Sequence, residues 1–152
     1  MAVQPFSRQE PVVAGYAVGF VIGGAVTIAG ALSRWMTRAV VSDNAGIDFG
    51  EGRIILSLGI IAVLLGVVAV FNHAASVEIL VAATGCALAA AVLSLAVAEI
   101  HEIQSYQNIL AYIIPTVGEG LWVTVAGGSI VGLSSLTALG RGIARLTREY
   151  YP

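Results

Sequence analysis

The sequence predicts an all-α fold, an integral membrane four-helix bundle, and two observations support it. Four uncharged apolar runs, residues 11–32, 54–71, 79–98 and 121–139, make up most of the chain, and its seven basic and nine acidic residues all lie outside them. Each run has 18 to 22 residues, which at about 1.5 Å per residue can cross a hydrocarbon core of about 30 Å. We therefore expect a single four-span transmembrane domain covering residues 1–152.

The composition excludes several other classes of protein. With 58% hydrophobic and 11% charged residues in 152, the chain has no room for a separate soluble domain, and its runs lack the polar stripes of a water-soluble bundle. A net charge of −2 argues against a nucleic-acid partner and leaves membrane lipids as the expected surroundings. The single cysteine, Cys86, cannot form a disulfide within one chain.

The first run is expected to stay in the mature protein, because it is too long for the apolar region of a signal peptide. Gly15, Gly19 and Gly23 recur along it at every fourth position, and Gly128 and Gly132 form a similar patch in the last run. Such small-residue faces let helix backbones approach closely in lipid. They are expected to pack within one monomer, and a docking face for a second subunit is the alternative.

The connections follow from turn chemistry and length. Residues 33–53 contain turn-forming combinations at 43–46 and 50–52 and are expected to be an irregular loop. Residues 72–78 are so few that the second and third runs should form an antiparallel hairpin. In the last connection the apolar stretch 109–114 is too short to span and should lie against the outer membrane interface.

Orientation is predicted from the arginines. The last run is followed by Arg141, Arg145 and Arg148, and Arg8 lies on the same side of the membrane. Arg34, Arg38 and Arg53 lie on the other side. The compact cluster after the last run favours cytoplasmic termini in the cell membrane, because positive residues stay inside.

A short internal repeat suggests two tandem helical hairpins. Gly50-Glu51-Gly52 opens the second span and Gly118-Glu119-Gly120 opens the fourth, 68 residues later; Gly59 matches Gly127 at the same offset. A parallel repeat predicts a pseudo-two-fold axis along the membrane normal, with both Gly-Glu-Gly turns together at the outer end. A chance match is the alternative, because the chain has 18 glycines.

Polar and aromatic residues are expected to form an outer rim, whose members are Arg34, Trp35, Glu51, Arg53, Glu119 and Trp122. The favoured interpretation is a charge-paired cap, in which arginines hold carboxylates where the spans leave the bilayer. The other interpretation is a pocket for a polar lipid headgroup or small ligand, framed by the two tryptophans.

Nothing in the sequence indicates catalysis, a cofactor or a metal site. Glu99, His101 and Glu102 are close in sequence, but on a helix the histidine points away from the face that the two glutamates share. The nucleophile, phosphate-loop and zinc-helix motifs are absent. We expect that the protein is not an enzyme.

The order of these features resembles small four-span integral membrane proteins of actinobacterial type, most of which have no assigned function. The resemblance covers nearly the whole chain and depends on the glycine-rich first span ending at Trp35 and on residues 50–54 and 117–122. The short turn at 72–75 departs from it, because it lacks the arginines that such proteins often carry there.

The expected function is therefore non-catalytic: the protein should act by helix contacts, as an accessory or assembly subunit of a larger membrane complex or as a homo-oligomer. One alternative is a small transporter or channel, with an oligomeric pore lined by the hydroxyls of Thr27, Ser57, Thr84, Ser94, Thr124 and Ser129. The other is a lipid-binding or sensing module that uses the outer rim.

Overall fold

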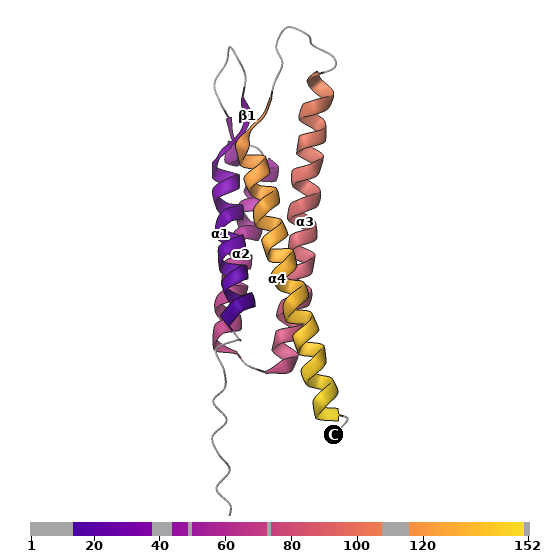
Figure 1. The fold of residues 1–152 in the computed structure, drawn as a ribbon. Helices are drawn as coiled ribbons and strands as arrows, with labels where there is room; N and C mark the ends of the chain where they lie inside the picture. The colour runs from indigo at the N-terminus through magenta and orange to yellow at the C-terminus, as the bar shows by residue number, and fades with distance from the viewer. Residues whose placement is uncertain (1–13, 38–43, 49, 73, 108–115, 151–152) are drawn as a thin grey trace, which may run out of the picture.

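Four long helices run side by side in the computed structural model (Figure 1). They are α1 (Ala14–Leu32), α2 (Gly50–Phe71), α3 (Ala75–Gln107) and α4 (Glu119–Tyr150). The structure describes residues 14–37, 44–48, 50–72, 74–107 and 116–150. The predicted all-α four-helix bundle is confirmed, and all four helices are long and apolar enough to cross a membrane.

Two helices extend well beyond their predicted spans. The third predicted span, 79–98, lies inside α3, which has 33 residues, and the fourth, 121–139, lies inside α4, which has 32. A helix can continue into water after it leaves the bilayer, since its backbone hydrogen bonds are internal and charged side chains tolerate helical geometry. Hydropathy therefore predicted the apolar part of each helix, whereas α3 and α4 themselves begin before and end after that part.

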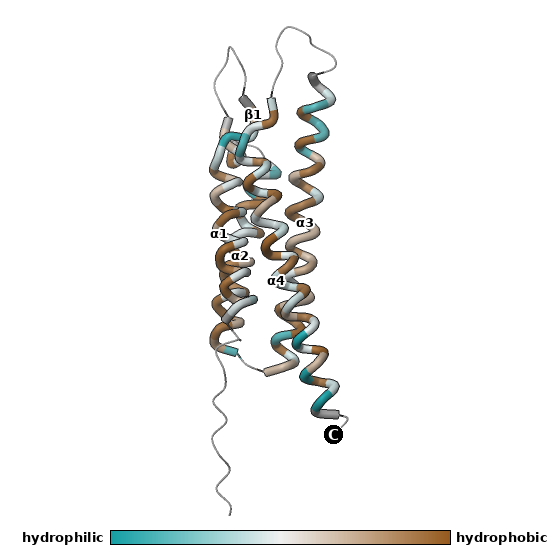
Figure 2. Tube along the Cα trace, viewed as in Figure 1, coloured by the Kyte–Doolittle hydropathy of each residue, from teal (hydrophilic) through white to brown (hydrophobic). Residues whose placement is uncertain are grey.

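Polar residues gather at the two ends of the bundle, and the middle is apolar (Figure 2). On α3, Glu78 and Glu99 are about 32 Å apart along the helix axis, and on α4, Glu119 and Arg141 are about 33 Å apart. These separations match a hydrocarbon core of about 30 Å. The charge spacing thus agrees with the composition in indicating a multi-pass membrane protein.

The helices do not pack with two-fold symmetry. α1 lies between α2 and α4, and α3 packs mainly on α4, so that α2 and α3 touch only sparsely. A two-fold axis relating the hairpins would make the α2–α3 contact as extensive as the α1–α4 contact. The repeat-related glycines Gly59 and Gly127 both face α1, Gly59 at Gly24 and Ile28 and Gly127 at Gly23 and Thr27. The predicted pseudo-two-fold arrangement is therefore wrong for the packing, although both Gly-Glu-Gly segments do lie at one end.

A small sheet closes that end, where a purely irregular loop was predicted. Strands β1 (Arg34–Thr37), β2 (Asn44–Ala45) and β3 (Thr116–Val117) are ordered β2-β1-β3 and are antiparallel. The described part of the predicted turn at 43–46 belongs to β2 and to the 3-10 helix η2 (Gly46–Asp48), and the predicted turn at 50–52 is instead the start of α2. Turn composition could not reveal that Met36 and Thr37 of β1 pair with Val117 and Thr116, 81 and 79 positions later. We call this end the sheet end, and the end with Arg141, Arg145 and Arg148 the arginine end. The predicted interfacial stretch 109–114 lies outside the described residues.

Candidate functional site

The glycine face of α1 packs against α4 of the same chain. A Cβ atom added at Gly19 would collide with the Ser134 side chain, and one at Gly23 would lie 2.8 Å from Val131 and 3.0 Å from the Gly127 carbonyl oxygen. Both glycines thus allow the two helices to approach closely. This agrees with packing inside one monomer and leaves neither glycine open to a second subunit.

The other three predicted packing glycines differ from one another. Gly128 contacts α3, where an added Cβ would lie 3.0 Å from Val92, and an added Cβ at Gly132 would lie 3.4 Å from Ala89. At Gly15 an added Cβ would have no described atom within 4 Å. Gly15 is therefore exposed and takes no part in the close α1–α4 contact, although it lies four residues before Gly19 in the same glycine series.

The expectation that both tryptophans lie on the surface of the outer rim is wrong for Trp35. Trp122 is 57% exposed, but Trp35 is 1% exposed and lies in a core with Ala31, Ile55 and Leu121. Its indole Nε1 donates a hydrogen bond to the Gly30 carbonyl oxygen at 3.0 Å. β1 follows α1 directly and places the Trp35 side chain in this core, so that the indole does not frame a pocket.

Glycines from separate segments make room for that indole. An added Cβ at Gly46 would collide with the Trp35 ring, and one at Gly120 would lie 2.9 Å from it. Gly118 donates its backbone N–H to the Trp35 carbonyl oxygen at 2.7 Å. Between the glycines, Glu51 and Glu119 each lie in the first turn of a helix, where a carboxylate is favoured by the helix dipole. The Gly-Glu-Gly segments therefore have a local structural role, whatever their ancestry.

The charge-paired cap expected of the other rim residues stays a prediction. Glu51, Glu119 and Arg34 are exposed. Arg53 donates from Nε to the Ile47 carbonyl oxygen at 3.1 Å, a contact with backbone that ties η2 to the first turn of α2. Among the described residues we find no group of three His, Cys, Asp or Glu side chains placed to hold a metal ion.

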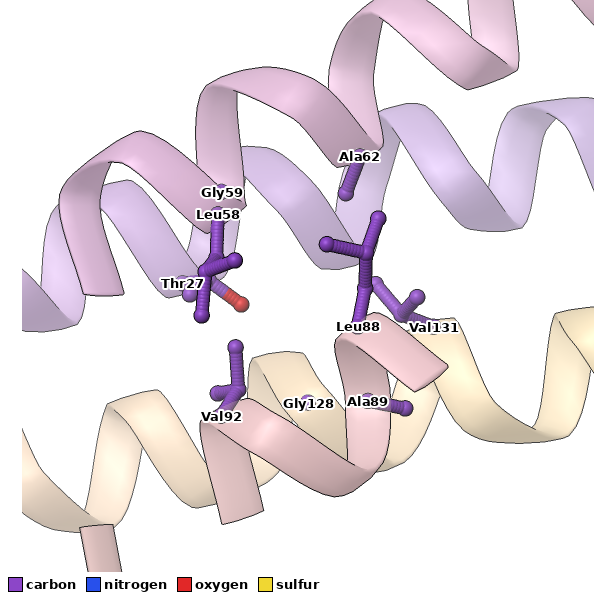
Figure 3. A pocket seen from close by; sticks show the side chains of 9 residues that line it. All are labelled: Thr27, Leu58, Gly59, Ala62, Leu88, Ala89, Val92, Gly128 and Val131. Atoms are coloured by element: carbon purple, nitrogen blue, oxygen red, sulfur yellow. The ribbon is translucent and has the colours of Figure 1, made fainter. Parts of the chain in front are cut away.

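The centre of the bundle is filled by small and aliphatic side chains. A void of about 10 Å³ remains where α2 and α3 face each other, lined by Leu58, Ala62, Leu88 and Val92 together with residues of α1 and α4 (Figure 3). That volume is at the lower limit for one water molecule. The Thr27 hydroxyl at its edge is already used, because it donates to the Gly23 carbonyl oxygen at 2.8 Å.

The six hydroxyls considered for a pore are all engaged in the same way. Each donates to a backbone carbonyl three or four residues earlier in its own helix, at 2.8 to 3.0 Å; the six are Thr27, Ser57, Thr84, Ser94, Thr124 and Ser129. Only Thr27 and Thr124 are buried, and they lie between α1 and α4. The hydroxyls therefore do not converge on one path through the monomer.

Sequence reasoning missed a charged cluster at the arginine end. Glu78, assigned from sequence to the connection before the third span, lies in the first turn of α3 and is only 3% exposed. Its Oε2 accepts a hydrogen bond from Arg145 Nη1 at 3.1 Å. This ion pair joins α3 to α4. The contact needs two residues 67 positions apart, so no local pattern could have predicted it.

Two further residues complete the cluster. The Arg141 guanidinium lies 6.0 Å from the centre of the Tyr16 ring, which is 6% exposed on α1, a distance at the limit of a cation–π contact. An open hollow of about 260 Å³ is lined by Arg141, Ala144, Arg145 and Arg148. The three arginines are spaced by four and three residues, a pattern that could have indicated one basic face of the helix. In the sequence analysis they served only to predict the orientation in the membrane.

No protein-family model matches this chain, and no curated protein matches it. The resemblance to actinobacterial four-span proteins therefore stays a prediction.

Proposed function

We propose that this chain is a non-catalytic membrane protein that acts through helix contacts, as an accessory or assembly subunit of a larger complex or as a homo-oligomer. The observation that supports this proposal best is the filled centre. Its void of about 10 Å³ has mainly aliphatic walls, and the Thr27 hydroxyl there is already bonded. Among the described residues this void holds at most about one water molecule, which favours a function carried by the outer surface.

Helix α2 offers the broadest such surface. Its buried positions are small except for Ile55, and include Gly59, Ala62, Gly66 and Ala69. Many of its large side chains face outward, with Leu64 58% exposed and Phe71 78% exposed. Because α3 covers it only sparsely, most of α2 is open to lipid or to another transmembrane helix. Van der Waals packing would drive such an association in the bilayer.

Site-specific cross-linking in native membranes tests the proposal. A photoreactive residue would be placed at Leu64 on α2, with the same residue at Leu133 on α4, which is 66% exposed, as the matched control. We expect a discrete cross-linked partner or dimer from position 64, and the full chain purified in mild detergent should carry the same partner. A strictly monomeric, partnerless chain that gives no adduct at position 64 would contradict the proposal.

The two alternatives have less support. A transporter or channel would need an oligomer, because Ser57, Ser94 and Ser129 are exposed on the outside of the bundle. Flux in liposomes above an empty-vesicle control would revive that alternative. A lipid-sensing module at the outer rim loses its aromatic frame, because Trp35 is buried.

We further propose that the protein lies in the cell membrane with the arginine end in the cytoplasm. Arg141, Arg145 and Arg148 follow the predicted span of α4 within about three turns, where positive charge has its greatest effect on orientation. A reporter that is active only in the cytoplasm, fused after residue 152, should be active. Activity of a reporter specific for the opposite side would contradict this orientation.

A further inference from the structure

Glycines bring three pairs of neighbouring helices into close contact. A Cβ atom added at Gly24 of α1 would lie 2.8 Å from the Gly59 carbonyl oxygen of α2, and one at Gly30 would lie 2.9 Å from a carbonyl oxygen of α4. Between α4 and α3, a Cβ added at Gly142 would lie 2.7 Å from the Ile79 side chain. Because van der Waals contact holds helices together in lipid, the close approach at these glycines stabilises all three contacts.

The contact of α3 with α4 is strengthened further by charge. Arg145 Nη1 of α4 lies 3.1 Å from the Glu78 carboxylate in the first turn of α3, and the Glu78 side chain is 3% exposed. Separating the two helices here would leave a buried carboxylate without its counter-ion, which is costly in surroundings of low dielectric constant. We therefore expect α3 and α4 to stay together.

The contact between α2 and α3 is built differently. The two helices touch only sparsely. Leu58 and Ala62 of α2 face Leu88 and Val92 of α3 across the void of about 10 Å³ (Figure 3). The described side chains with which α2 and α3 line this void are thus aliphatic, and those beside the void lack part of the van der Waals contact that close packing would give them.

The glycines within these two helices serve other contacts. A Cβ added at Gly59 or Gly66 of α2 would meet α1 first, and one at Gly85 of α3 would meet Phe20 of α1 and Ser135 of α4. Aliphatic contact alone is a weak attachment in a bilayer, because lipid acyl chains offer each helix the same contacts. Of the four helix contacts, the one between α2 and α3 therefore costs least to open.

We propose that the bundle opens sideways to the lipid between α2 and α3, at a contact that we call the seam, while the three glycine-lined contacts stay closed. Acyl chains then replace the aliphatic contacts that are lost and fill the void. The short connection from Phe71 to Ala75 limits the opening at the arginine end. This conformational device depends only on contacts inside one chain and is independent of the proposed contact function.

Distances between pairs of spin labels, measured by double electron–electron resonance in lipid nanodiscs, test the seam. Cys86, the single cysteine, is first replaced by alanine. The seam pair is Ser57→Cys with Ser94→Cys, two exposed positions on α2 and α3 that are close in sequence to Leu58 and Val92 beside the void. The labelled chain is diluted with unlabelled chain, so that every distance is measured within one molecule, whatever oligomer forms.

Two matched pairs use the same labels on contacts that should stay closed. Ser57→Cys with Ala25→Cys reports on α2 against α1, and Ser94→Cys with Ala126→Cys reports on α3 against α4; all four positions are exposed. The seam pair should give two distances, one that fits the structure and one that is longer. Each matched pair should give a single narrow distance.

A change in the void should shift the populations of the seam pair. Leu88→Ala enlarges the cavity, which stays empty when the seam is closed and is filled by lipid when the seam is open. The longer distance should therefore gain about tenfold in population relative to the shorter one. The two matched pairs should keep their single distances in this variant.

A single narrow distance for the seam pair, both in the starting chain and in Leu88→Ala, would overturn the proposal. Equal broadening of all three pairs would also overturn it, because the bundle would then be loose throughout and the seam would not be special. If Leu88→Ala does not fold, the three pairs in the starting chain decide the question: a longer distance confined to the seam pair supports the seam, and its absence refutes it.

Discussion

Replacing Trp35 by alanine should destabilise the protein far more than the same change at Trp122. Trp35 is 1% exposed, so nearly its whole side chain, about 150–250 Å², is removed from solvent. At about 25 cal/mol per Å² this corresponds to about 4–6 kcal/mol, which is an upper bound because the unfolded chain stays partly compact. Mutational experience with buried tryptophans gives about 3–5 kcal/mol.

The indole hydrogen bond adds a smaller part. The Gly30 carbonyl oxygen that accepts from Trp35 also accepts the Ser33 backbone N–H at 3.2 Å, so losing the indole leaves it with a partner. The bond then contributes about 1 kcal/mol. We expect a loss of about 4 kcal/mol for Trp35→Ala and about 1–2 kcal/mol for Trp35→Phe, which keeps a ring but loses the donor.

The assay is unfolding of the purified chain in mixed detergent micelles, followed by far-UV circular dichroism. Trp122→Ala is the matched control, since that side chain is 57% exposed at the same end of the bundle, and it should cost less than about 1 kcal/mol. Fluorescence gives a second readout: in a Trp122→Phe background Trp35 should resist acrylamide quenching. Equal destabilisation by the two alanine variants, or a readily quenched Trp35, would refute the argument that β1 buries Trp35.

Three further predictions concern the helix contacts. Gly19→Leu should prevent folding or cost about 1–3 kcal/mol because its side chain meets α4, whereas Gly15→Leu should be tolerated; a folded but dissociated Gly19→Leu oligomer would contradict this. Glu78→Gln should lower the free energy of unfolding by about 1–3 kcal/mol. In a double-mutant cycle, Glu78→Gln with Arg145→Gln should cost less than the two single changes added together. Strict additivity would show that the ion pair contributes nothing. Thr27→Val should change stability by about 1 kcal/mol and leave oligomeric state unaltered, because its hydroxyl bonds only its own helix; loss of a transport activity in liposomes would argue otherwise.

The membrane bundle was predictable because it depends on composition along the chain. Runs without charge had the right number and position, and the end of the second run at residue 71 coincides with the end of α2. The glycine spacing predicted close helix contact, but it could not say which neighbour each glycine meets. Gly15 and Gly19 look equivalent in sequence, yet only Gly19 lies against α4.

The candidate sites were less predictable, because each depends on residues far apart in the chain. The residues predicted to form the outer rim do lie together at one end of the bundle, the sheet end. Burial of Trp35 depends on β1 pairing with β3 and on Gly46 and Gly120, from two separate segments, beside the indole, none of which hydropathy can report. The pair of Glu78 and Arg145 is likewise set by the way α3 lies on α4.

The sequence by itself therefore determined that the helices are suited to a lipid bilayer, how many spans there are and where the two polar ends lie. The reason is that the free energy of transfer from water to lipid depends on each residue's own chemistry. Only the tertiary structure decided that α1 lies between α2 and α4, that Trp35 closes the sheet end and that a charged hollow forms at the arginine end. Those features arise from steric fit and ion pairing between distant segments, and such interactions have no counterpart in a local stretch of sequence.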